Sequence, residues 1–188
     1  MATQVLLPTA DYASSGIASY SSGSTAFNLL TDNEATNKIT YTVADGSVEV
    51  TIQKMGTAAS ISSVQVYCQD SGSGGGADTF SSSSVYVRIG GVNYTGSTGA
   101  TAAARTYSYT WTTNPATGAA WTPVSINSIQ AIGFSCATWI TAGCSPTYLV
   151  LNVSYLPAPD STDITRHLGS VDLWLKKRPE TYITMTGS

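Results

Sequence analysis

Acid–base or nucleophilic catalysis would need residue types that this chain holds in small numbers. The 188 residues include one histidine, three cysteines and eleven Asp and Glu. Nucleophilic catalysis usually places a histidine beside a serine or cysteine. His167 lies near the C-terminus, and we interpret it as a surface residue. Ser135 stands in a G-x-S-x-A run, but residues 138–143 lack the helical pattern that a nucleophile elbow requires. The sequence therefore predicts no catalytic residues and no enzyme activity.

The acidic residues include two pairs that are close in sequence, Asp32 with Glu34 and Asp70 with Asp78. Paired carboxylates are the catalytic groups of most glycosidases, and a calcium ion takes six to eight oxygen ligands. We interpret Asp32 and Glu34 as polar loop groups. Asp70 and Asp78 flank a glycine-rich loop and could bind a cation, but too few further ligands gather around them. We expect no metal and no cofactor.

The cysteines are Cys68, Cys136 and Cys144, with no C-x-x-C spacing and no histidine nearby, which argues against a zinc site. Cys68 continues an apolar alternation, which predicts a buried thiol. Cys136 and Cys144 flank a short loop at a spacing that suits a disulfide, whereas disulfides seldom persist in a reducing cytosol. Bridged and free states of this pair both stay open.

These side chains must be positioned by strands, because alternation of apolar and polar residues dominates the chain. Single helical turns are expected only near 26–30 and 125–129, and the Asp45-Gly46 pair predicts a hairpin between its two flanking strands. Alternation buries one face of each strand. We predict an all-β fold, an antiparallel jelly-roll-like β-sandwich of about eight strands. The clearest strand segments are 39–43, 48–52, 61–68, 85–89, 107–111 and 149–155.

The sandwich is expected to occupy residues 1–157 and to be followed by an extended C-terminal arm, residues 158–188. The arm contains four of the eight basic residues and an apolar alternation. Docking on its own sandwich and docking on a neighbouring subunit are both open. The arm residues predicted to bind the partner are Leu173, Trp174, Leu175, Lys176, Lys177, Arg178 and Tyr182.

Charged residues make up 10% of the chain, and the net charge is −3. An ordinary soluble domain has about 25%. The lack of a basic stripe argues against nucleic-acid binding, and no apolar run is long enough to span a membrane. The N-terminus lacks the pattern of a secretory signal, so we expect synthesis in the cytoplasm. Aromatic residues can stack on glycans, but more often they fill a core or an interface.

The run Asn114–Thr122, which reads NPATGAAWT, and the following Ile126–Phe134 resemble a segment found in many structural proteins of tailed bacteriophages. In those proteins the turn leads to a short helical turn and then to a strand. Residues Ile61–Tyr67 and Thr147–Leu156 fit the same pattern, so the resemblance covers residues 5–156. The family usually has a tryptophan where this chain has Gly16–Ala18.

The resemblance implies a virion structural protein and brings no catalytic residues. It favours a capsid decoration or cement protein that binds the particle surface, present as a homo-oligomer or in many copies. The implied partners are other virion proteins, either major capsid or tail proteins, and the implied location is the virion. Two alternatives remain: a tail, neck or baseplate component, and a carbohydrate-binding module that uses a glycan ligand for host adhesion.

Overall fold

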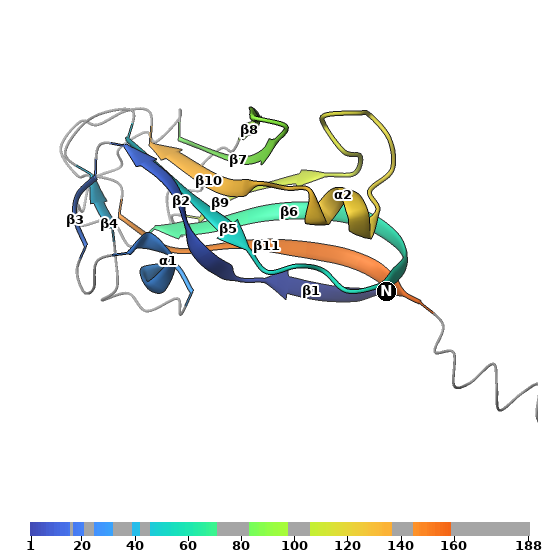
Figure 1. Cartoon of the computed structure of the whole chain (residues 1–188). Helices are drawn as coiled ribbons and strands as arrows, with labels where there is room; N and C mark the ends of the chain where they lie inside the picture. Colours follow the sequence, from blue (N-terminus) through green and yellow to red (C-terminus); the bar gives the residue numbers. More distant parts are fainter. Residues whose placement is uncertain are drawn as a thin grey trace, which may run out of the picture. The chain divides into compact units, whose positions relative to one another are not determined.

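The structure is a computed structural model that describes residues 1–15, 17–20, 25–31, 39–41, 46–70, 83–97, 106–136 and 145–158. The chain divides into two compact units, Met1–Pro157 and Ala158–Ser188. Apart from Ala158, the second unit lies outside the described residues. In chain order the described elements are β1 (Ala2–Leu6), β2 (Pro8–Ser15), β3 (Ile17–Tyr20), α1 (Ala26–Leu29), β4 (Ile39–Tyr41), β5 (Gly46–Ile52), β6 (Ala58–Asp70), β7 (Ser84–Ile89), β8 (Val92–Ser97), β9 (Thr106–Trp111), α2 (Pro123–Asn127), β10 (Ala131–Cys136) and β11 (Pro146–Pro157) (Figure 1).

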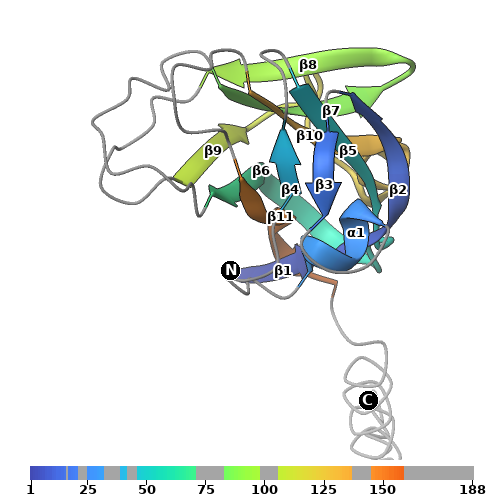
Figure 2. The ribbon, with the colours of Figure 1, turned by 90° about the vertical axis from the view of Figure 1, so that its left-hand side faces the viewer.

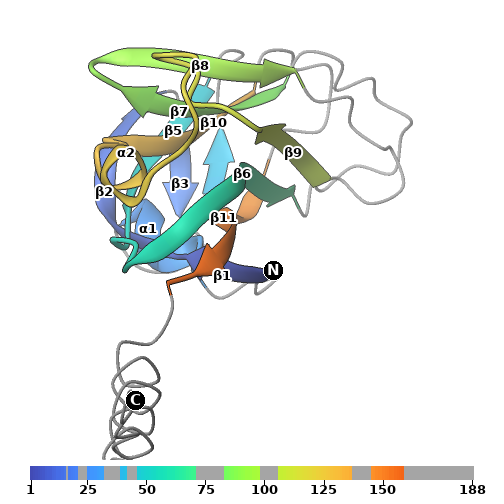
Figure 3. The ribbon, with the colours of Figure 1, turned by 90° about the vertical axis from the view of Figure 1, so that its right-hand side faces the viewer.

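The strands of the first unit form a sandwich of two antiparallel sheets. One sheet has the strand order β1-β11-β6-β9 and the other the order β2-β5-β10-β7-β8. Figures 2 and 3 show these sheets as two layers. A separate ribbon of β3 and β4 lies with α1 at one end of the sandwich (Figure 1). The prediction of an all-β sandwich is therefore confirmed.

The hydrophobic core lies between the two sheets, because alternate residues of each strand point inward. The rings of Tyr107 and Phe134 meet across this space, with centroids 5.0 Å apart. Such alternation is what a strand with one buried face requires. The core residues include Leu6, Val48, Val50, Ile61, Val64, Val66, Cys68, Val85, Val87, Ile132, Leu149, Leu151 and Val153.

The predicted hairpin around Asp45-Gly46 is wrong. β4 pairs with β3, and β5 pairs with β2 on one side and β10 on the other. Both edges of β5 are therefore occupied by other strands. The Asp-Gly signal is local, whereas strand pairing is decided by which partner helps to bury Val48, Val50 and Ile52.

Both predicted helical turns are present. The first is α1, and the second, α2, begins two residues earlier than predicted because Thr122 caps it. The Thr122 side chain accepts from the Ser125 amide, and the Ser125 side chain accepts from the Thr122 amide. Pro123 follows at the position where its missing N–H has no cost. In the described part of the chain, neither helix is long and apolar enough to cross a membrane.

Candidate functional site

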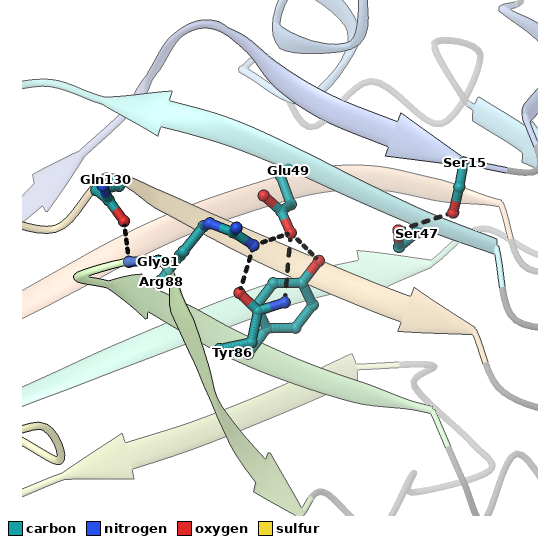
Figure 4. Close-up of polar contacts among 8 residues, drawn as sticks. Ser15, Ser47, Glu49, Tyr86, Arg88, Gly91 and Gln130 are labelled. Atoms are coloured by element: carbon teal, nitrogen blue, oxygen red, sulfur yellow. Dashed lines mark hydrogen bonds and ion pairs between the residues drawn. The ribbon is translucent and has the colours of Figure 1, made fainter.

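The most connected polar side chains lie on the outer face of the five-stranded sheet (Figure 4). Glu49 on β5 is only 6% exposed. Its Oε1 accepts hydrogen bonds from the Tyr86 hydroxyl at 3.0 Å, from Asn93 Nδ2 at 3.4 Å and from Arg88 Nη1 at 3.5 Å. Arg88 Nη1 also donates to Asn93 Oδ1 at 3.0 Å. We call these four residues the Glu49 network, and they join β5 to β7 and β8.

The network crosses the central strand β10 at Gly133. In the register of the sheet, Gly133 lies between Glu49 and Tyr86. A Cβ atom at this position would lie 2.2 Å from Tyr86 Cζ, a separation that real contacts do not reach. Glycine is therefore required for the tyrosine ring to lie across β10 and reach the carboxylate.

A β-bulge brings a further aromatic ring to the network. In β2, Asp11 pairs with Val50 and Ala13 with Glu49, so Tyr12 is the extra residue. The guanidinium carbon of Arg88 lies 5.6 Å from the centre of the Tyr12 ring, within the range of a cation–π contact. Bulges commonly redirect a side chain in this way. The Arg88 side chain, 28% exposed, is thus held from two sides.

The protonation and burial of the Glu49 network suit a contact that holds strands together. Burial, and then the neighbouring Glu49 carboxylate, raise the pKa of Tyr86 well above its ordinary value of about 10. Tyr86 therefore stays protonated and donates at neutral pH. Glu49 Oε2 and Arg88 Nε are buried and have no hydrogen-bond partner in the described part of the chain. The network therefore fastens β5, β7 and β8 together.

Beside the Glu49 network, one serine from each strand forms a row across the sheet. The side-chain oxygens of Ser15 and Ser47 lie 3.0 Å apart (Figure 4). Ser135 lies within β10, which continues to Cys136, so its backbone is not that of a nucleophile elbow. The row consists of Ser15, Ser47, Ser135, Ser84 and Ser97 in the order of the strands.

The segment that carries the phage resemblance folds as a tight turn. Asn114 Oδ1 accepts from the Ala116 amide at 2.9 Å, and Asn114 O accepts from the Gly118 amide at 2.7 Å. Gly118 has φ +73°, which favours glycine. Trp121 is buried and its indole donates to the carbonyl of Trp111 at 3.2 Å. Both tryptophans belong to the core, which is one of the two places, core or interface, predicted for most of the aromatic residues.

Cys68 and Asp70 are buried, and Cys136 is disulfide-bonded. Cys68 is free and buried, as predicted; burial, and then Asp70, raise the pKa of its thiol. Asp70 is 3% exposed, and its Oδ1 accepts from the Ser145 amide at 2.7 Å. Cys136 is disulfide-bonded, while Cys144 lies outside the described residues.

The outer face of the four-stranded sheet has a different composition. The rings of Tyr67 and Tyr148 meet edge to face, with centroids 6.3 Å apart and planes at 69°. Burial, and then Tyr67, raise the pKa of Tyr148 above its ordinary value. Asn152 Nδ2 donates to Gln65 Oε1 at 3.1 Å. These residues lie on β6 and β11 and point away from the core.

The arm residues predicted to bind a partner lie outside the described residues, as does His167. So do Asp32, Glu34, Asp78 and Trp139. Among the residues that the structure describes, no three His, Cys, Asp or Glu side chains gather as metal ligands. No sequence motif predicted the Glu49 network. One signal was present: Glu49 and Arg88 are the only charged residues of their strands, β5 and β7.

Comparison with protein-family models, with curated proteins and with solved structures finds no match to this chain. Any function must therefore be inferred from its residues and its fold.

Proposed function

We propose that the chain is a structural subunit of a tailed-bacteriophage particle, with the role of a decoration or cement protein on the capsid surface. One observation carries the proposal. The segment that resembles the phage proteins contains a turn closed by Asn114, then α2, then β10, the order that the resemblance implies. A position in the tail, neck or baseplate is the alternative within the same class.

We also propose a jelly-roll topology, which would support a role in a particle because it is frequent in viral capsid domains. The strand orders β1-β11-β6-β9 and β5-β10-β7-β8 fit two four-stranded sheets, and these eight strands alternate between the sheets in chain order except at the β7–β8 pair. Strand β2 then extends the second sheet as a continuation of β1. We propose this topology as the finer description of the sandwich. Fold alone does not determine function, so the role in a particle needs its own test.

The features that would favour a glycan-binding module are weak in the described part of the chain. Trp111 is 8% exposed and Trp121 is 3% exposed, so neither offers a stacking face. The Tyr67 and Tyr148 rings are steeply inclined to each other, whereas a flat sugar platform needs similar orientations. A glycan ligand is therefore the weaker alternative.

Particle association tests the proposal directly. Phage particles produced in the presence of the full chain are purified on a density gradient, and the chain is quantified by mass spectrometry and located by antibody labelling. We expect many copies per particle on the capsid surface. A chain that stays in the soluble fraction contradicts the proposal, and labelling confined to the tail selects the alternative position.

The arm is proposed to supply the attachment, through Leu173–Leu175, the Lys176–Arg178 cluster and Tyr182. A second contact that is covalently linked to the first raises its effective concentration. Replacing the three basic residues by serine in the full chain is expected to lower the copies per particle at least tenfold. Arg166→Ser removes a charge from the same arm outside the cluster and serves as the control. Equal incorporation of both variants contradicts this role of the cluster.

A further inference from the structure

Within the part of the chain that the structure describes, the strands of the four-stranded sheet carry no exposed charged side chain on their outer face. Strands β1, β11, β6 and β9 contain one charged residue, Asp70, and it is buried. A row across all four strands consists of Val5, Asn152, Gln65 and Thr110. The centres of protein interfaces are depleted in charged residues and enriched in tyrosine. This face has both properties, because Tyr67 and Tyr148 lie beside the row.

The polar groups of this face are self-complementary. Amide side chains, such as Gln65 and Asn152, and hydroxyl side chains, such as Tyr67 and Thr110, both donate and accept hydrogen bonds. A surface of this kind can bond to its own copy in a two-fold arrangement, where each group meets an equivalent set. A surface of carboxylates or of lysines cannot, because like charges would meet.

Apolar contact and area also fit an interface. Val5 is 44% exposed and Leu156 is 54% exposed, and both lie on this face because their neighbours Leu6 and Tyr155 point toward the core. The strand lengths, with a rise of about 3.3 Å per residue and a spacing of about 4.8 Å, give the whole outer face a projected area of about 600 Å², although Val150 on this face is only 1% exposed. Stable complexes bury from about 600 to 1,000 Å² on each partner.

The geometry points to a second copy of this chain as the occupant of the face, in a two-fold dimer that packs the two four-stranded sheets against each other. The inference rests on the proposed function in one respect, that the protein works in many copies. It adds which surface joins two copies. With a net charge of −3 on each molecule, a charge-free face is where two copies meet without repulsion.

Sedimentation equilibrium of the full chain, from about 1 to 100 μM, tests the inference in the range where dimers of this size form. We expect a concentration-dependent dimer. Thr110→Lys on edge strand β9 is expected to weaken the dimer at least tenfold, because it places a charge in a face that loses water when the two sheets pack. Thr95→Lys, an exposed threonine on edge strand β8 of the other sheet, is the matched control and is expected to leave the dimer unchanged.

Gln65→Glu is a second, conservative variant, since a carboxylate still accepts from Asn152 while it adds charge at the middle of the face. We expect the same loss of dimer. A chain that stays monomeric at every concentration overturns the inference, as does equal weakening by Thr95→Lys. A monomer that binds a glycan array through this face also overturns it. A dimer that never enters phage particles leaves this inference standing and contradicts the proposed function instead.

Discussion

The two outer faces of the sandwich use their polar residues in opposite ways. On the five-stranded sheet, Glu49 receives three donors from its own sheet, and the ring of Tyr86 fills the space above Gly133. On the four-stranded sheet, Gln65 and Asn152 bond to each other and retain further donors and acceptors. The first face gathers its polar groups around one carboxylate, whereas the described strands of the second pair two neutral amides and carry no exposed charged side chain.

This difference gives the low charge of the chain a structural meaning. Of the four charged residues within the described strands, two lie on the face that is closed by its own contacts. Glu49 and Arg88 lie there as an ion pair with a separation of 3.5 Å. The other sheet contributes only the buried Asp70. Composition alone could not show this segregation, which makes one face suitable for close approach.

The largest effect is expected from Glu49→Ala. The variant leaves Arg88 and the Tyr86 hydroxyl without their common acceptor. Breaking a buried ion pair costs 3–5 kcal/mol, and the partial exposure of Arg88 lowers the expected loss to about 2–3 kcal/mol. Urea unfolding measures it. Asn152→Ala removes a polar contact from the other face and should lower the stability by less than about 1 kcal/mol. Similar losses for the two variants would remove the contrast between the faces.

Gly133→Ala is expected to lower the free energy of unfolding by about 2 kcal/mol, within the range for overpacking. The new methyl group would displace the Tyr86 ring from β10. The same substitution made in a Tyr86→Ala background should have little effect, because the clash is then absent. Thermal unfolding of the four proteins of this cycle gives the coupling between the two positions. Additive effects would show that the ring does not lie over Gly133.

The stability of the chain is expected to fall as the pH rises above about 10. The folded-state pKa of Tyr86 is raised, so its contribution is fully present below the unfolded-state pKa of about 10 and is lost as the pH rises toward the folded value. Tyr86→Phe removes this titration and should flatten the dependence between pH 10 and 11, at a cost of about 1–2 kcal/mol at neutral pH. Unchanged pH dependence in this variant would assign the loss to other tyrosines.

The smallest effects on stability are expected from Thr110→Lys and Thr95→Lys. Both residues are exposed, and such substitutions usually change stability by less than about 0.5 kcal/mol. Thermal unfolding at a protein concentration below the dissociation constant of the dimer measures this change in stability. A larger loss of stability for Thr110→Lys would mean that the substitution disturbs β9 itself. The dimer would then be tested with Gln65→Glu.

The sandwich could be predicted because most of its long strands show alternating apolar and polar residues in the sequence. The predicted strands 149–155 and 61–68 fall within β11 and β6. Their inward side chains are the apolar residues of the alternating pattern. Which strands pair with one another could not be predicted as well. The Asp45-Gly46 signal concerns two neighbouring segments, while β5 is placed by β2 and β10, which are distant in sequence.

The Glu49 network could not be predicted for the same reason. Tyr86 and Asn93 are 37 and 44 residues from Glu49 in the sequence. They reach it because the sheet places β7 and β8 on the other side of β10 from β5, and the Tyr86 ring lies across β10. The small outward residue that makes the contact feasible, Gly133, lies in a segment that we read only as a strand. A motif search finds residues that are close in sequence, whereas this cluster depends on the order of strands in a sheet.

Tyrosine footprinting of the full chain compares the two faces in one molecule and tests the central claim most directly. Tyr148 lies on the four-stranded face, and Tyr12, which is 43% exposed, lies on the five-stranded face. Nitration at low and at high protein concentration is followed by mass spectrometry. We expect Tyr148 to become protected as the concentration rises, while Tyr12 reacts equally at both. Protection of Tyr12, or no change at Tyr148, would contradict the assignment of the four-stranded face as the surface that joins two copies.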